Sequence, residues 1–149
     1  MKTKLTHTVV ALICLIGILP GFSLTASAQS HYSPVMVAKR SFLNQKGSIQ
    51  QFLLHTVPKD GLYRVTAYIT TPSCSFNGAE FNGSLSWTDD FDSFQYPFSG
   101  LGCTSAGGAF SGSSSFVVRA KAGTAISMDM QAEDSTVLYD LFVTVERIS

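Results

Sequence analysis

Charged residues are scarce in this chain of 149 residues. Asp, Glu, Lys and Arg together make up 13% of the sequence, and 10 basic residues balance 10 acidic ones. No run of basic residues breaks this balance. A protein that neutralises nucleic-acid phosphates needs a concentrated basic surface, so we expect no nucleic-acid partner.

Long hydrophobic runs are also missing. The apolar run at 9–19 is shorter than the roughly 20 residues that a membrane-spanning helix needs, so we do not expect a transmembrane protein. A short basic start precedes this run and Ala26-Ser27-Ala28 follows it, which is typical of a signal peptide and its cleavage site. We expect removal of residues 1–28, a mature start at Gln29, and a secreted, periplasmic or cell-surface protein.

Cysteine is sparse, and only Cys74 and Cys103 follow the expected leader. A pair of cysteines in an exported chain usually forms a disulfide, because the compartment is oxidising. We expect these two to pair, and closing a loop of about 30 residues would stabilise the fold by about 3.5 kcal/mol. Zinc is the alternative interpretation, but the spacing is not CxxC and His31 and His55 are the remaining histidines.

Motifs of common catalytic sites are lacking. The sequence has no Gly-x-Ser-x-Gly elbow, no HExxH and no phosphate-binding loop. A small hydrolase would require His55 to lie in a pocket beside a carboxylate. We therefore expect a protein without catalytic residues and keep the hydrolase as the least favoured function.

Apolar and polar residues alternate along two long segments, 61–71 and 137–148. A period of two residues is typical of a strand with one buried face. The residues expected to be buried are Tyr63, Val65, Ala67, Ile69, Tyr139, Leu141, Val143 and Val145. Six shorter candidate strands are 40–44, 48–57, 81–87, 94–98, 115–120 and 124–131.

About eight strands separated by turns, without a βαβ unit, predict an all-β fold. We expect an antiparallel β-sandwich of jelly-roll type over residues 39–149. Residues 29–38 should form an extended arm with an apolar part at 35–37.

An acidic cluster follows the single tryptophan of the chain. Asp89, Asp90 and Asp92 come directly after Trp87-Thr88, with Phe91 between them. Calcium prefers several carboxylate oxygens on a loop, but the spacing is not that of an EF-hand. The alternative, which we favour, is a hairpin turn in which Asp bonds the local backbone. No other cofactor is expected.

Five aromatic residues lie in this region, namely Trp87, Phe91, Phe94, Tyr96 and Phe98. Exposed planar rings would stack on the faces of sugars. The alternation of Phe94, Tyr96 and Phe98 instead favours the interior of a sandwich, and Pro97 marks an edge strand because it lacks a backbone donor.

Gly61-Leu62-Tyr63-Arg64-Val65 resembles the Gly-x-Tyr strand entry of secreted jelly-roll modules, such as C1q and TNF-like domains and phage tail-fibre modules. The strand pair at 116–120 and 123–130 and the terminal strand ending at Ile148 are similar too. The resemblance implies this architecture. The C-terminus departs from the Phe-rich ending of C1q domains, so neither trimerisation nor ligand residues are carried over.

The sequence thus predicts an exported, non-catalytic β-sandwich that acts as a binding or surface-interaction module. The expected ligand is a glycan or cell-surface polymer, bound by the surface that comprises Trp87, Asp89, Asp90, Phe91 and Asp92. The alternative is a homo-oligomeric structural or adhesive subunit that joins its neighbours through residues 35–37.

Overall fold

The computed structural model describes residues 33–74, 79–103 and 108–149, with the side chains of Ala79 and Cys103 excepted. The expected signal peptide, 1–28, lies outside these residues. In the described part of the chain, no helix is long and apolar enough to cross a membrane. The strands are β1 (Val35–Lys46), β2 (Ile49–Thr56), β3 (Gly61–Thr71), β4 (Ala79–Thr88), β5 (Ser93–Cys103), β6 (Phe110–Ala120), β7 (Ala125–Ala132) and β8 (Leu138–Arg147).

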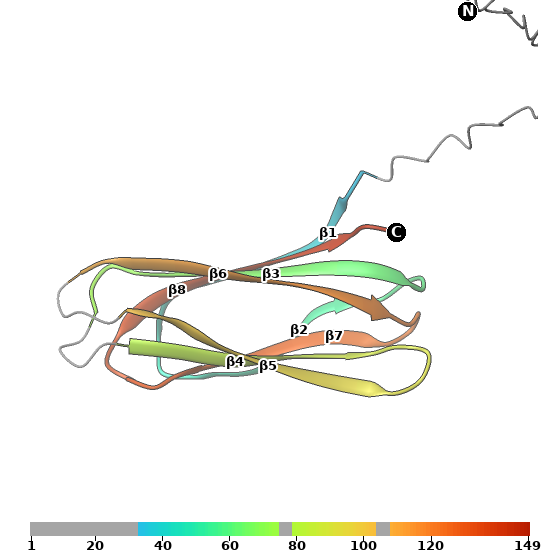
Figure 1. Ribbon diagram of the computed structural model, residues 1–149. Helices are drawn as coiled ribbons and strands as arrows, with labels where there is room; N and C mark the ends of the chain where they lie inside the picture. The colour runs from blue at the N-terminus through green and yellow to red at the C-terminus, as the bar shows by residue number, and fades with distance from the viewer. Residues whose placement is uncertain (1–32, 75–78, 104–107) are drawn as a thin grey trace, which may run out of the picture. The chain divides into compact units, whose positions relative to one another are not determined.

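The eight strands form two antiparallel sheets of four, in the orders β1-β8-β3-β6 and β2-β7-β4-β5. Figure 1 shows them as two layers. Apart from the β4–β5 hairpin, consecutive described strands lie in opposite sheets, which is the strand order of a jelly roll. The expected all-β, antiparallel jelly roll is therefore confirmed, and the chain has the architecture of the modules it resembles.

The core lies between the two sheets and follows the alternation in the sequence. Both expected rows of apolar residues, on β3 and β8, are at most 1% exposed. The two buried tyrosines among them keep their hydroxyls satisfied, since Tyr63 donates to Lys59 O and Tyr139 donates to Gly47 O, each at 2.7 Å. Burial raises the pKa of Tyr139 to about 12, because the phenolate would lose its hydration.

Three strands, β1, β5 and β6, extend by five residues at one end beyond their predicted bounds. β5 continues from the predicted 94–98 to Cys103, and β6 begins at Phe110 rather than at 115. These extensions are rich in Ser and Gly, which have low strand propensity, but β6 pairs with β3 over its whole length. Residues 35–38, assigned from the sequence to the arm, form the start of β1 and pair with β8.

Three connections, β2–β3, β4–β5 and β6–β7, lie at one end of the sandwich (Figure 1), which we call the hairpin end. Main-chain hydrogen bonds join them: Lys121 N donates to Thr88 O at 2.9 Å, and Gly123 N donates to Val57 O at 2.8 Å. The Asp60 carboxylate also accepts from Ala122 N at 2.6 Å. The predicted aromatic and acidic site therefore sits on a braced end of the fold.

Candidate functional site

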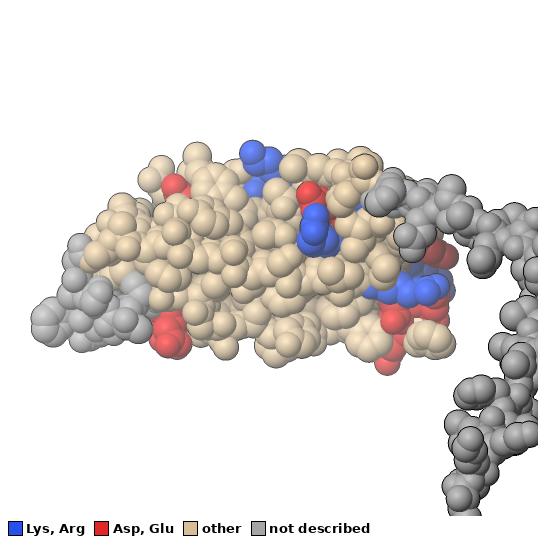
Figure 2. All heavy atoms as spheres, turned by 45° about the horizontal axis from the view of Figure 1, so that its top comes forward, with Lys and Arg blue, Asp and Glu red and all other residues tan. Residues whose placement is uncertain are grey.

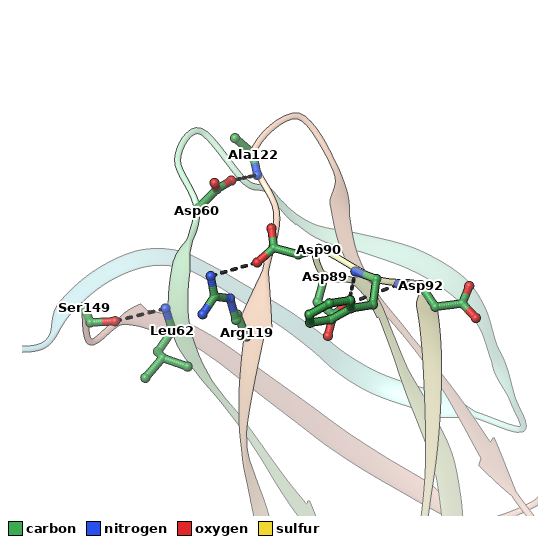
Figure 3. Close-up of polar contacts among 9 residues, drawn as sticks. Asp60, Leu62, Asp89, Asp90, Asp92, Arg119, Ala122 and Ser149 are labelled. Atoms are coloured by element: carbon green, nitrogen blue, oxygen red, sulfur yellow. Dashed lines mark hydrogen bonds and ion pairs between the residues drawn. The ribbon is translucent and has the colours of Figure 1, made fainter.

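The β4–β5 turn is ordered by its own aspartates, as Figure 3 shows. Asp89 Oδ1 accepts hydrogen bonds from Phe91 N at 2.7 Å and from Asp92 N at 3.1 Å. Asp92 Oδ1 accepts from Ser93 N at 2.7 Å, and Asp89 N closes the turn on Asp92 O at 3.0 Å. Two of the three carboxylates thus serve the turn, which is the alternative that the sequence favoured.

The third carboxylate, Asp90, forms an ion pair across the hairpin end. Its Oδ2 lies 2.7 Å from Nη2 of Arg119 on β6 (Figure 3), and both side chains are substantially exposed. An exposed pair of this kind contributes under about 1 kcal/mol, but it fixes the relative position of two strand ends. Among the described residues no three His, Cys, Asp or Glu side chains gather to hold a metal ion. Calcium binding by this cluster stays an untested prediction.

Trp87 lies in a groove between the free edges of β5 and β6. The groove has a volume of about 390 Å³. Its lining comprises Leu85, Trp87, Tyr96, Ser115, Phe116, Val117 and Val118. We call it the edge groove. It exists because β5 and β6 are the outermost strands of opposite sheets, so neither sheet covers the rings between them at this side.

Aromatic contacts arrange the rings of the edge groove. The half-buried Trp87 stacks on Phe94, with centroids 5.5 Å apart and planes inclined by 20°. Tyr96 packs against Phe116 at 5.8 Å. Phe98 is buried as predicted, but the expectation of core packing is wrong for Phe94 and Tyr96, which are 41% and 55% exposed. They share the inward face of β5, yet the sandwich is open where they lie.

Phe91 lies in the turn of the same hairpin and is 90% exposed. The hydrogen bond from Phe91 N to the Asp89 carboxylate holds its backbone, so the ring is presented on an ordered turn. Of the five predicted ligand residues, Trp87 thus lines the edge groove and Phe91 lies at the tip of the β4–β5 turn. The three aspartates lie in the turn between Trp87 and β5, where they bond its main chain or pair with Arg119.

A second hollow, which sequence reasoning missed, lies on the outer face of the β2-β7-β4-β5 sheet. The register between β4 and β5 shifts between Phe81 and Gly83, so Asn82 lies opposite two β5 residues, Ser99 and Gly100. A recess of about 290 Å³ opens there. We call it the polar recess. Its lining comprises Asn82, Gly83, Ser84, Gln95, Pro97, Phe98, Ser99, Asp129 and Gln131.

Nothing in a single sequence reveals the polar recess, because its residues come from three strands and a bulge. The weak signals were two glycines within strands: Gly100 at the bulge, where φ is 82°, and Gly83 at a close backbone approach. A Cβ on Gly83 would lie 2.6 Å from Asp129 O and from Phe98 Cζ.

His55 and the cysteines complete the predicted sites. The His55 ring lies 5.8 Å from that of Tyr63, and neither ion pair found among the described residues involves it. Burial, and secondly the charge of Arg40, lower its pKa. Cys74 is 7% exposed, and its N donates to Gly108 O at 2.9 Å. The side chain of Cys103 lies outside the described residues, so its pairing with Cys74 stays a prediction.

Comparison with known proteins finds distant structural similarities. No protein-family model and no curated protein sequence matches the chain. The Eiger TNF from S. frugiperda is similar with a TM-score of 0.43 and 13% identity, over 78% of this chain and 93% of that one. A chain of infectious bursal disease virus, Gx strain, gives 0.19 and 11%, over 78% of this chain and 36% of the viral one. At these values neither likeness bears on function.

Proposed function

We propose that this protein is a non-catalytic recognition module that binds carbohydrate in the edge groove. One observation carries the proposal: Trp87, Phe94 and Tyr96 leave a partly exposed aromatic surface beside a groove of about 390 Å³. A soluble monomeric fold normally buries such rings, so a cluster of them at an open edge favours a ligand.

The chemistry of the edge groove fits a sugar ring. The C–H faces of a pyranose are apolar and pack on aromatic planes, while its hydroxyls need polar partners at the rim. Tyr96 brings a phenolic hydroxyl, and the free edge of β6, at 115–118, brings main-chain donors and acceptors. None of the described residues that line the groove is charged, which favours an uncharged stretch of polymer.

The surface charge agrees with a neutral ligand. Figure 2 shows a face that is mostly uncharged, with Lys, Arg, Asp and Glu gathered most densely near one end. In this proposal the aspartates of the turn do not touch the ligand. They hold the hairpin that carries Trp87, and Phe91 extends the apolar surface beyond the groove for a longer polymer.

Replacing Trp87 by alanine tests the proposal. We expect a loss of binding of at least tenfold in a glycan screen followed by calorimetry, with the fold retained because Trp87 lies at the open edge rather than in the centre of the core. Tyr68→Ala is the matched control, since Tyr68 is 42% exposed and packs on Phe142 away from the edge groove. Equal binding by both variants and the parent protein would contradict the proposal.

Export belongs to the proposal as well. The signal-peptide pattern at 1–28 supports a mature protein that acts outside the cytoplasm, where a Cys74–Cys103 disulfide would be stable. Cys74 lies just beyond β3 and Cys103 ends β5, so a bridge would tie the two sheets together at the end opposite the hairpin end.

Self-association is the second candidate function, and exposure along β1 favours it. β1 pairs only with β8 among the described strands, so its other edge is free, and Val35 and Met36 are 61% and 57% exposed. Replacing both by threonine should dissociate an oligomer in light scattering coupled to gel filtration. A parent protein that is monomeric at high concentration would remove this candidate.

A further inference from the structure

The polar recess on the outer face of the β2-β7-β4-β5 sheet is held in one arrangement by a chain of hydrogen bonds. Gln95 Nε2 donates to Ser84 Oγ at 2.7 Å, and Ser84 Oγ donates to Asp129 Oδ2 at 2.6 Å. Ser84 N also donates to Asp129 Oδ1 at 3.1 Å. These bonds cross three neighbouring strands, so the lining is preorganised.

The Ser84 hydroxyl and main-chain N–H of this network donate internally, while acceptors remain. Asp129 accepts one bond at each oxygen, and a carboxylate oxygen can accept two. Neither of the two ion pairs found in the described part of the chain includes Asp129. Asn82 Oδ1 is buried and has no hydrogen-bond partner among the described residues. A buried acceptor without a partner is costly, and a ligand that displaces the atoms covering Oδ1 and donates to it would remove that cost.

We propose that the polar recess is a second binding site, which takes the hydroxyl groups of a neutral sugar chain. Its free acceptors, on Asp129 and Asn82, call for donors, and a sugar presents several hydroxyl donors at close spacing. An anionic ligand would be repelled by Asp129. The inference rests on the proposed carbohydrate function for its ligand class, but it uses residues on the opposite face of β4 and β5 from those of the edge groove.

A neighbouring hollow extends the site across the sheet. A pocket of about 190 Å³ shares Asp129 and Gln131 with the polar recess and reaches 48–51 at the start of β2. In it, Gln51 Nε2 donates to Ser127 Oγ at 3.0 Å on the same outer face. The two hollows together form a track across all four strands, which suits an extended chain of sugars rather than a single ring.

The test uses four neutral tetrasaccharides, built from glucose, mannose, galactose and N-acetylglucosamine, and a uronic-acid tetrasaccharide as the anionic comparison. Binding is located by amide chemical shifts and measured by calorimetry. We expect at least one neutral tetrasaccharide to shift the amide signals of Asn82, Ser84 and Asp129. Asn82→Ala and Asp129→Asn should each weaken this binding at least tenfold.

Two controls separate binding from stability. Asn82→Ala should not lower the melting temperature, because Oδ1 has no partner to lose. Asp140→Asn changes a carboxylate on the other sheet that likewise accepts from a backbone amide, Asn44 N at 2.7 Å, and should bind as the parent does.

The inference is overturned if no neutral tetrasaccharide shifts these signals, or if the two recess variants bind as tightly as Asp140→Asn. It is also overturned if, when a fully deacetylated glucosamine tetrasaccharide is added to the set, it alone binds, which would indicate an ion pair. Loss of binding in Trp87→Ala alone would also overturn it while leaving the proposed function intact. Binding that depends on Asn82 and Asp129 but not on Trp87 would support it and contradict the edge groove instead.

Discussion

His55 is the residue whose protonation should affect folding most directly. Its Nε2 is buried without a partner among the described residues, and burial, followed by Arg40, lowers its pKa from the ordinary 6.5. The unfolded chain therefore binds a proton at a pH where the folded chain does not. The contribution of neutral His55 to the free energy of unfolding is therefore fully present above about pH 6.5. This contribution is lost as the pH drops below that value.

His55→Gln provides the measurement for this effect. The variant cannot titrate at this position, so its urea midpoint should fall less than that of the parent between pH 7.5 and pH 5. Parallel losses in the two proteins would show that His55 does not contribute to the acid sensitivity.

Asp89 and Asp90 should differ in their contributions to stability although they are adjacent in the sequence. Asp89→Ala removes an acceptor of two main-chain amides and should cost about 1–3 kcal/mol of unfolding free energy. Asp90→Ala removes one exposed ion pair and should cost under about 1 kcal/mol. Chemical denaturation compares them, and a larger loss in Asp90→Ala would contradict the roles assigned to the turn.

At the scale of strands, the interior was predictable and the edges were not. Along β3 and β8 a strict alternation of large apolar residues predicted the buried face, because both strands are central in their sheet and the opposite sheet covers their inward face. Phe94 and Tyr96 follow the same alternation and yet are exposed. Their position at an open edge depends on the order of strands in the sheets, which a periodicity cannot encode.

The candidate sites show the same division. The turn at 89–92 was predictable because Asp acts on neighbouring backbone amides. The partnership of Asp90 with Arg119 was not, since 29 residues separate them and only the β6–β7 connection brings Arg119 to the hairpin end. The polar recess required a bulge, and a register shift leaves almost no trace in one sequence.

Gly83 should tolerate substitution far less well than Gly112, although both lie within strands. A Cβ on Gly83 would meet the main-chain oxygen of Asp129 and Phe98 Cζ, each at 2.6 Å, in a buried and paired segment. On Gly112 the closest atom is the ring tip of the partly exposed Phe110, at 2.7 Å, which can move aside. We expect Gly83→Ala to cost about 2–3 kcal/mol and Gly112→Ala about 1 kcal/mol. Equal melting temperatures would contradict the packing at Gly83.

For the whole molecule, the two ends of the sandwich are held by different means. Main-chain bonds and Asp60 brace the hairpin end, where β2–β3, β4–β5 and β6–β7 meet. At the opposite end the sequence predicts a disulfide between Cys74 and Cys103. With both ends held in this way, the strands that carry the edge groove and the polar recess would keep a fixed arrangement.

The disulfide is tested on the mature protein. Intact-mass measurement after alkylation should show no free thiol until the protein is reduced, and reduction should then lower the free energy of unfolding by about 3 kcal/mol. Alkylation of two thiols without reductant would show that the pair is not bonded.

The most direct test of the carbohydrate-binding edge groove uses its own tryptophan. Trp87 is the single tryptophan of the chain, so emission excited at wavelengths that tyrosine does not absorb reports on this groove alone. Titration of the mature protein with the four neutral tetrasaccharides should give, for at least one, a saturable shift of the emission to shorter wavelength as the sugar displaces water from the indole. Emission unchanged by all four, at millimolar concentration, would contradict the proposal that Trp87 binds carbohydrate.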